Sequence, residues 1–205
     1  MSALKSKSGA GSEPAALEPA AGTRWAPTAS DLLAQARKRF LAGERCDIES
    51  LAAGLGVSRA TAYRWAGNAD ALMGEVVASL TEATFRRNAR EVRGKGAARI
   101  LEVMERGLRA IADSRAYQAF LARDPQRSLR IVASKEGPSQ QRAITLHQEL
   151  LEEEMAKGHL KLPVDAHTMA YALVRLAESF LYADLIAGEK PDLDKAMKIL
   201  KMMLR

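Results

Sequence analysis

The sequence of 205 residues contains a single cysteine, Cys46, and only three histidines. One cysteine excludes a disulfide within the chain and leaves no cysteine cluster for zinc. The histidines, His147, His159 and His167, do not share a metal-ligand spacing. We therefore expect no metal and no cofactor, and the composition suits a reducing compartment such as the cytoplasm.

Long apolar runs and strand-like alternation are also missing from the sequence. No stretch reaches transmembrane length and no signal peptide is recognisable, so we expect a cytoplasmic protein with no membrane partner. No run of alternating β-branched residues is long enough for a strand. Leu, Ala, Met, Arg and Glu are abundant instead. The composition therefore predicts an all-α fold.

Sequence features of enzymes are scarce as well. The chain has no Gly-rich phosphate loop and no nucleophile elbow, and Asp124 and Glu178 are isolated carboxylates. We name no catalytic residue and expect that the protein is not an enzyme. An enzyme acting on a small molecule remains an alternative that turnover would reveal. The net charge of +6 weakly favours a polyanionic partner.

The stretch from Cys46 to Leu72 has the pattern of two short helices joined by a tight turn. Apolar residues recur at helical spacing in the first helix, and Asp47 can cap its first turn. Gly56 allows the sharp bend that follows. Ser58 can then cap a second helix from about Arg59 to Trp65. This order of elements predicts a helix-turn-helix.

The second helix of this stretch has a small apolar underside around Ala62 and an outer face of polar and aromatic side chains. Such a helix suits the major groove of DNA. Arginine can bind guanine edges, while hydroxyl groups and a capped helix N-terminus suit phosphates. The alternative is an exposed helix that packs on another protein. The predicted DNA contacts are Ser58, Arg59, Thr61, Tyr63, Arg64 and Trp65.

The same stretch carries a more specific signature. Its members are Leu51-Ala52, Gly56-Val57-Ser58, Thr61, Tyr63 and Leu72. These residues resemble the DNA-binding signature of TetR-type bacterial repressors. Ala66 stands where the family usually has Phe, and Trp65, one residue earlier, can compensate in packing. Ala69 stands where the family usually has a Lys that meets a DNA phosphate, so that contact is in question.

The resemblance implies a homodimeric transcriptional regulator, a repressor, that binds a palindromic operator in double-stranded DNA and responds to a small-molecule effector. Its fold would be an N-terminal three-helix helix-turn-helix domain followed by a C-terminal helical domain for ligand binding and dimerisation. Two recognition helices would then lie about one DNA turn, roughly 34 Å, apart. The alternative is a helical homodimer whose N-terminal domain binds protein rather than DNA.

The chain divides into three parts by composition. Residues 1–27 are rich in Ala, Gly, Ser and Pro and cannot bury enough apolar surface to fold, so we expect a disordered tail. We expect residues 28–80 to form the DNA-binding domain and residues 81–205 the ligand-binding and dimerisation domain. A nearly all-apolar helix over 166–187 and the last helix would supply a four-helix dimer interface.

Three details of helix packing follow from the periodicity. Leu33, Ala36 and Phe40 should share one face of the first helix, with Leu32 and Leu41 beside it. The helix over 139–157 carries three consecutive glutamates, which are most simply a solvated face. The helix over 166–187 should be unbroken, because no proline or glycine interrupts it before Gly188. The three glutamates of the helix over 139–157 are Glu152, Glu153 and Glu154.

Candidate ligand contacts lie in the second half of the chain. Four polar or aromatic residues fall on one side of the penultimate helix, and two of them, Arg175 and Glu178, can pair. They either line a pocket or form a satisfied buried pair. Five further residues either line the same cavity or are ordinary core. The full set is Met104, Leu108, Tyr117, Phe120, His147, Tyr171, Arg175, Glu178 and Tyr182.

The body of the chain carries a second resemblance. The stretches ARDPQR and ALVRLAESFLYADLIAGEKPDLDKA are similar to the subgroup of TetR regulators named for QsdR, which is tied to quorum-sensing lactone degradation. This resemblance implies a lactone or a related acyl compound as the effector.

Overall fold

The computed structural model describes residues 26–135 and 137–205, so nearly all of the expected tail at 1–27 lies outside the described residues. The described residues form eleven α-helices and no strand, which confirms the all-α prediction. None of these helices is both long and apolar enough to cross a membrane. The helices are α1 (Ala29–Leu41), α2 (Ile48–Leu55), α3 (Arg59–Ala66), α4 (Ala69–Glu91), α5 (Gly96–Ala112), α6 (Arg115–Arg123), α7 (Pro125–Ala133), α8 (Pro138–Ala156), α9 (Ala166–Leu181), α10 (Ala183–Ala187) and α11 (Leu193–Met203).

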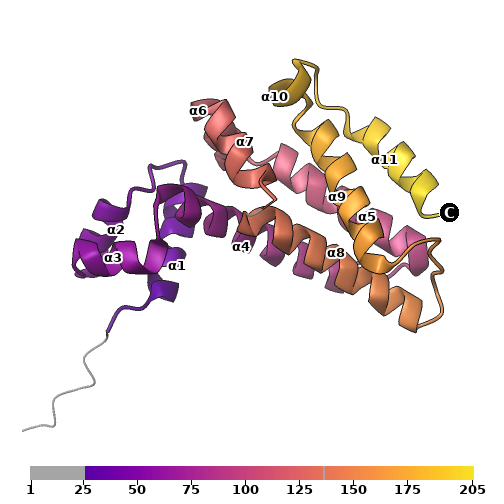
Figure 1. The fold of residues 1–205 in the computed structure, drawn as a ribbon, viewed down its shortest axis with the longest axis horizontal. Helices are drawn as coiled ribbons and strands as arrows, with labels where there is room; N and C mark the ends of the chain where they lie inside the picture. The colour runs from indigo at the N-terminus through magenta and orange to yellow at the C-terminus, as the bar shows by residue number, and fades with distance from the viewer. Residues whose placement is uncertain (1–25, 136) are drawn as a thin grey trace, which may run out of the picture.

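The molecule is elongated, with two parts joined by one long helix (Figure 1). We call residues 28–80 the head and residues 81–205 the body. Helices α1–α3 cluster at one end, and α4 runs from this cluster into the body. In the body, α4 packs on α8, α8 packs on α9, and α11 covers α9 and α5. The head is therefore connected to the body through the middle of α4 and through the packing of α1 against α6.

The apolar core of the head is formed by α1, α2, α3 and the start of α4, and it continues into α6, α7 and the end of α9. Leu32, Ala36 and Phe40 of α1 are buried against Leu51 of α2 and Ala62 of α3. Leu41 is not part of this core, because its side chain is 59% exposed. Leu32, rather than the half-buried Leu33, takes the central position on the inner face.

Local capping fixes where the head helices begin and end. Asp47 accepts a hydrogen bond from the backbone N–H of Ser50 at 2.8 Å, which caps α2. Gly56 then ends α2 in the left-handed conformation, with φ of 67°, a conformation that favours glycine. Ser58 accepts from the N–H of Thr61 at 3.1 Å and caps α3. The predicted helix-turn-helix is confirmed.

Glu154 corrects one expectation for the body. It was expected in a solvated run, yet it is only 1% exposed. Its carboxylate accepts hydrogen bonds from the N–H of Gly96 at 2.6 Å and from Arg99 Nη1 at 2.7 Å. The physical reason is helical spacing, because Leu146, Leu150 and Glu154 recur every four residues on the buried face of α8.

Tyr182 corrects a second expectation, since the predicted helix over 166–187 is broken there. Helix α9 ends at Leu181, and α10 begins at Ala183 after Tyr182 leaves the helical conformation, with φ −108° and ψ 24°. The Tyr182 side chain is buried, and its hydroxyl pairs with that of Tyr117 at 2.6 Å. The break accompanies this tertiary contact rather than a proline or glycine.

Candidate functional site

Helix α3 presents its outer face to solvent at the tip of the head. Arg59, Tyr63 and Arg64 are exposed, while Ala62 on the opposite side is buried in the core of the head. Ser58 and Thr61 lie at the N-terminus of α3, where their hydroxyl oxygens are 2.9 Å apart. Hydrogen-bond donors of side chains and a helix N-terminus therefore lie on one surface. Such a surface can bind the phosphate groups of DNA.

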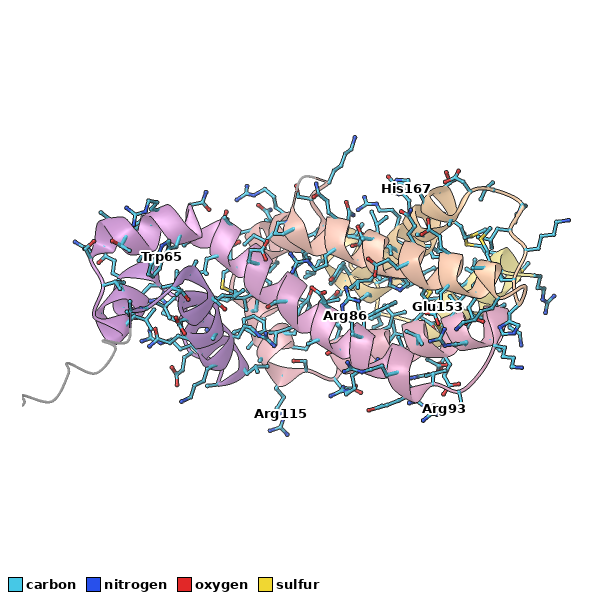
Figure 2. All side chains as sticks on the ribbon, turned by 90° about the horizontal axis from the view of Figure 1, so that it is seen from below. Trp65, Arg86, Arg93, Arg115, Glu153 and His167 are labelled. Atoms are coloured by element: carbon cyan, nitrogen blue, oxygen red, sulfur yellow. The ribbon has the colours of Figure 1, made fainter. Side chains whose placement is uncertain are left out.

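Trp65 does not share this outer face as expected. It is half-buried, and its side chain packs against the apolar core of the head (Figure 2). It stands one residue before Ala66, a position the related signature usually fills with Phe. Trp65 therefore supplies apolar packing between α3 and the rest of the head, as the sequence comparison with the TetR signature allowed.

The two arginines of α3 differ in their surroundings. Arg59 forms an ion pair with Glu49 of α2. Arg64 forms no ion pair with any residue in 26–135 or 137–205. Both guanidinium groups lie on the exposed face. Of the two, only Arg64 has no ion-pair partner among the described residues. It is the simpler candidate for a base contact.

A cavity of about 200 Å³ lies where the head meets the body. Phe40 of α1 and Val77 of α4 line its head side, and residues of the second half of α4, of α5–α9 and Tyr182 line the rest. Most of this lining is apolar. Six of the nine predicted ligand contacts line it, namely Met104, Leu108, Tyr117, His147, Glu178 and Tyr182.

The other three predicted contacts do not line this cavity. Tyr171 is 48% exposed on α9, and the Arg175 guanidinium donates to the carbonyl oxygen of Ala133. The end of α7 reaches Arg175 through Ala133, and the start of α8 reaches Glu178 through Gln140, whereas Tyr171 is nearer the N-terminus of α9. Phe120 instead packs against Phe40, with ring centroids 5.8 Å apart, and lines a neighbouring cleft.

One end of the cavity is polar. Tyr117 and Tyr182 are buried there and joined through their hydroxyls, and burial raises the pKa of both phenols. Burial also raises the pKa of Glu178, against the lowering effect of hydrogen bonds from Gln140 and Arg175. The Glu178 oxygen that accepts these bonds is 3.0 Å from each donor nitrogen. This polar end is therefore rich in hydroxyl and carboxyl groups.

His147 lies on another wall, beside Phe85. Its Nδ1 is 2.7 Å from the carbonyl oxygen of Ala143, and burial lowers the pKa of the ring. The imidazole is therefore neutral near pH 7. Sequence reasoning missed Gln140, which reaches Glu178, and the head residues Phe40 and Val77, because no local pattern shows that these segments meet.

The described residues contain no group of three or more His, Cys, Asp or Glu side chains arranged to hold a metal ion.

The comparisons with known proteins agree with this geometry. Residues 95–205 match the family described as "Tetracyclin repressor-like, C-terminal domain". The structure is similar to that of the R. erythropolis transcriptional repressor QsdR from the TetR family, with a TM-score of 0.81 and 31% sequence identity, over 86% of this chain and 93% of that chain. The chain belongs to the TetR family. It is therefore a transcriptional regulator with an N-terminal helix-turn-helix.

A second solved structure shares the fold of this TetR family member. It is the TetR family repressor AlkX from a Dietzia species, implicated in biodegradation of n-alkanes, with 21% identity and a TM-score of 0.60. The match covers 89% of this chain and 97% of that chain, and at this identity it shows the fold alone. No curated protein sequence matches this TetR family member significantly.

Proposed function

We propose that this protein is a homodimeric repressor that binds a palindromic operator through α3 and is released when a small, mostly apolar ligand fills the cavity. The observation that carries this proposal is the position of the cavity, which residues of both the head and the body line. A ligand there would contact α1 and α4 of the head directly, so it can favour one orientation of the head over another.

The DNA side of the proposal rests on α3. Ser58, Arg59, Thr61, Tyr63 and Arg64 present hydroxyl and guanidinium groups beside a capped helix N-terminus. We assign Arg64 to base edges, and the hydroxyls to phosphates or base edges. Trp65 supports this surface from behind.

The ligand side rests on the contrast within the cavity wall. Its lining is mostly apolar, and Tyr117, Tyr182 and Glu178 are among its polar residues. Such a cavity suits a ligand that is largely apolar with few polar groups. A lactone or related acyl compound, implied by the resemblance to the QsdR subgroup, fits this description.

Release would follow from linkage between the two sites. A ligand lowers operator affinity only as far as it binds the non-fitting arrangement of the heads more tightly than the fitting one. Helix α4 is the direct connection, because its first half is buried in the head and its second half packs on α8. The proposed four-helix dimer interface of the last helices would hold the two bodies while the heads change separation.

The experiment that tests this proposal is selection of operator sequences from randomised duplex DNA, followed by mobility-shift assays at two salt concentrations. We expect a selected palindrome with half-sites about one helical turn apart and affinity that falls steeply with salt. Failure to enrich any duplex would contradict the repressor assignment and favour the alternative in which the head binds protein.

A further inference from the structure

The Tyr117–Tyr182 pair has one hydrogen-bond donor left over. Each phenol carries one proton, and one of these protons is used in the hydrogen bond of 2.6 Å between the two hydroxyls. Among residues 26–135 and 137–205, neither hydroxyl makes another hydrogen bond. The second proton is therefore available to an acceptor at the polar end of the cavity. A buried donor without an acceptor is costly, so a ligand that supplies one would be favoured.

The same phenols remain donors over the working pH range. Burial raises the pKa of Tyr117 and of Tyr182, so both stay protonated near neutral pH. A ligand group that only donates would gain less at this position than one that accepts.

The cavity offers no positive charge to an anionic ligand. Among the described residues that line it there is no lysine and no arginine, and the buried ring of His147 is neutral. Glu178 also lines it, and a carboxyl group would repel an anion or leave it unpaired. Because an unpaired buried charge is strongly unfavourable, anionic ligands should be rejected.

The cavity should bind cationic ligands weakly as well. Among the described residues, Glu178 has the only carboxyl group that lines the cavity, and it already accepts hydrogen bonds from Gln140 and from the Arg175 guanidinium. The Arg175 guanidinium therefore already pairs with the Glu178 carboxylate, which a ligand ammonium group would need as its partner. Burial also raises the pKa of Glu178, which lowers its tendency to ionise.

The volume indicates the approximate size of the ligand. An apolar cavity of roughly 150 Å³ in another protein holds benzene. The cavity here, at about 200 Å³, has room for one ring with a small substituent, or for an acyclic chain of similar bulk.

Taken together, these features define a ligand class. We propose that the effector is an uncharged, largely apolar molecule whose hydrogen-bond acceptor, a carbonyl oxygen being the simplest, accepts from the Tyr117–Tyr182 pair. The proposal rests on the effector role of the cavity proposed above and narrows it to one chemistry. It makes the two tyrosines specificity-determining residues.

Four compounds of matched size and shape test this class. Acetophenone carries the carbonyl, cumene replaces its oxygen with a methyl group, benzoate is the anion, and protonated α-methylbenzylamine is the cation. Binding to the full-length wild-type protein is measured by calorimetry. We expect acetophenone and cumene to bind, and benzoate and the amine to bind at least about a hundredfold more weakly than acetophenone.

Removal of both hydroxyls isolates the hydrogen bond. In the double variant Tyr117→Phe/Tyr182→Phe, the ratio of the acetophenone Kd to the cumene Kd should rise roughly five- to tenfold, because only the ketone loses a donor. Tyr171→Phe is the matched control, since it removes an exposed hydroxyl from α9 outside the cavity. The ratio should not change in that control.

A measurement on the wild type keeps the test valid if the double variant does not fold. The infrared carbonyl stretch of bound acetophenone should shift to lower frequency than in hexane, as a hydrogen-bonded ketone requires. An unshifted carbonyl would overturn the proposal.

The remaining outcomes separate this proposal from the one before it. If cumene and acetophenone bind but their Kd ratio is the same in wild type and double variant, the cavity takes ligands and the proposed ligand class is wrong. Tightest binding of benzoate or of the amine would also overturn the class. If none of the four binds, both the class and the effector role of the cavity fail.

Discussion

Glu154, near the end of α8, accepts a hydrogen bond of 2.6 Å from the backbone N–H of Gly96, the first residue of α5. Arg99 and His159 also reach this buried carboxylate. Gly96 has φ of +55°, and a Cβ there would overlap the carbonyl oxygen of His159. These interactions join the end of α8 to the start of α5, at the end of the body away from the head.

Replacement of this carboxylate should destabilise the whole protein. We expect Glu154→Gln to lower the free energy of unfolding by about 2–3 kcal/mol at neutral pH, because the buried network loses its negative charge and an NH2 donor replaces one of its two acceptor oxygens. The measurement is urea unfolding followed by circular dichroism. Glu152→Gln, on the exposed side of the same helix, is the control and should stay within about 0.5 kcal/mol. Equal effects of the two changes would refute the role given to Glu154.

The same network sets a pH dependence. Burial alone would raise the pKa of Glu154, but the hydrogen bonds from Gly96, Arg99 and His159 outweigh it and hold the pKa below the ordinary value of 4.5. Ionisation therefore favours the folded state above pH 4.5, and this contribution is lost as the pH falls through the lowered pKa. Unfolding curves from pH 7 to pH 3 should show a smaller loss of stability in Glu154→Gln than in the wild type. A wild-type slope retained in the variant would assign acid sensitivity to other groups.

Trp65 should act through packing rather than through DNA. We expect Trp65→Ala to lower the free energy of unfolding by about 2 kcal/mol, because a half-buried ring that packs on the core of the head is lost. Trp65→Phe keeps an aromatic ring in place and should retain most of the stability and the operator affinity. Urea unfolding and fluorescence anisotropy with labelled operator give the two quantities. Lost operator affinity in Trp65→Phe at unchanged stability would instead show a direct DNA contact.

The helix boundaries of the head could be predicted from the sequence because they are set locally. The caps of Asp47 and Ser58 and the left-handed Gly56 act within a few residues of where they stand. One local feature of the sequence indicates the burial of Glu154, namely its spacing of four residues from the buried Leu150. Its partner Gly96 is distant in the sequence, so the contact itself could not be predicted. The break at Tyr182 left no local signal, since no glycine or proline marks it.

The candidate cavity was harder to predict for the same reason. Helical spacing predicted that Tyr171, Arg175, Glu178 and Tyr182 share one side of a helix, but α9 ends before Tyr182, and spacing does not show which segments cover a helix face. In the structure, Gln140 reaches Glu178, whereas Tyr171 stays exposed. Membership of the cavity therefore depended on tertiary neighbours.

The ion pair between Glu49 and Arg59 should weaken operator binding. Glu49→Gln removes a negative charge near the DNA surface and frees the Arg59 guanidinium, so we expect operator affinity to rise about two- to fivefold at low salt and less at high salt. Fluorescence anisotropy at two salt concentrations measures this. Glu105→Gln, in the body, is the charge-matched control and should leave the affinity unchanged. Weaker binding in Glu49→Gln would mean that the ion pair helps to position Arg59 for DNA.

The central claim is that α3 makes the sequence-specific contacts with DNA. Substitution of Arg64 tests this claim most directly. Operator affinity is measured for Arg64→Ala beside Arg93→Ala, an exposed arginine at the opposite end of the molecule from the head (Figure 2). We expect Arg64→Ala to weaken binding about 10- to 100-fold and to reduce discrimination between operator and random duplex, with Arg93→Ala unchanged. Equal affinity of Arg64→Ala and wild type, or equal losses in both variants, would contradict the assignment of α3 as the recognition helix.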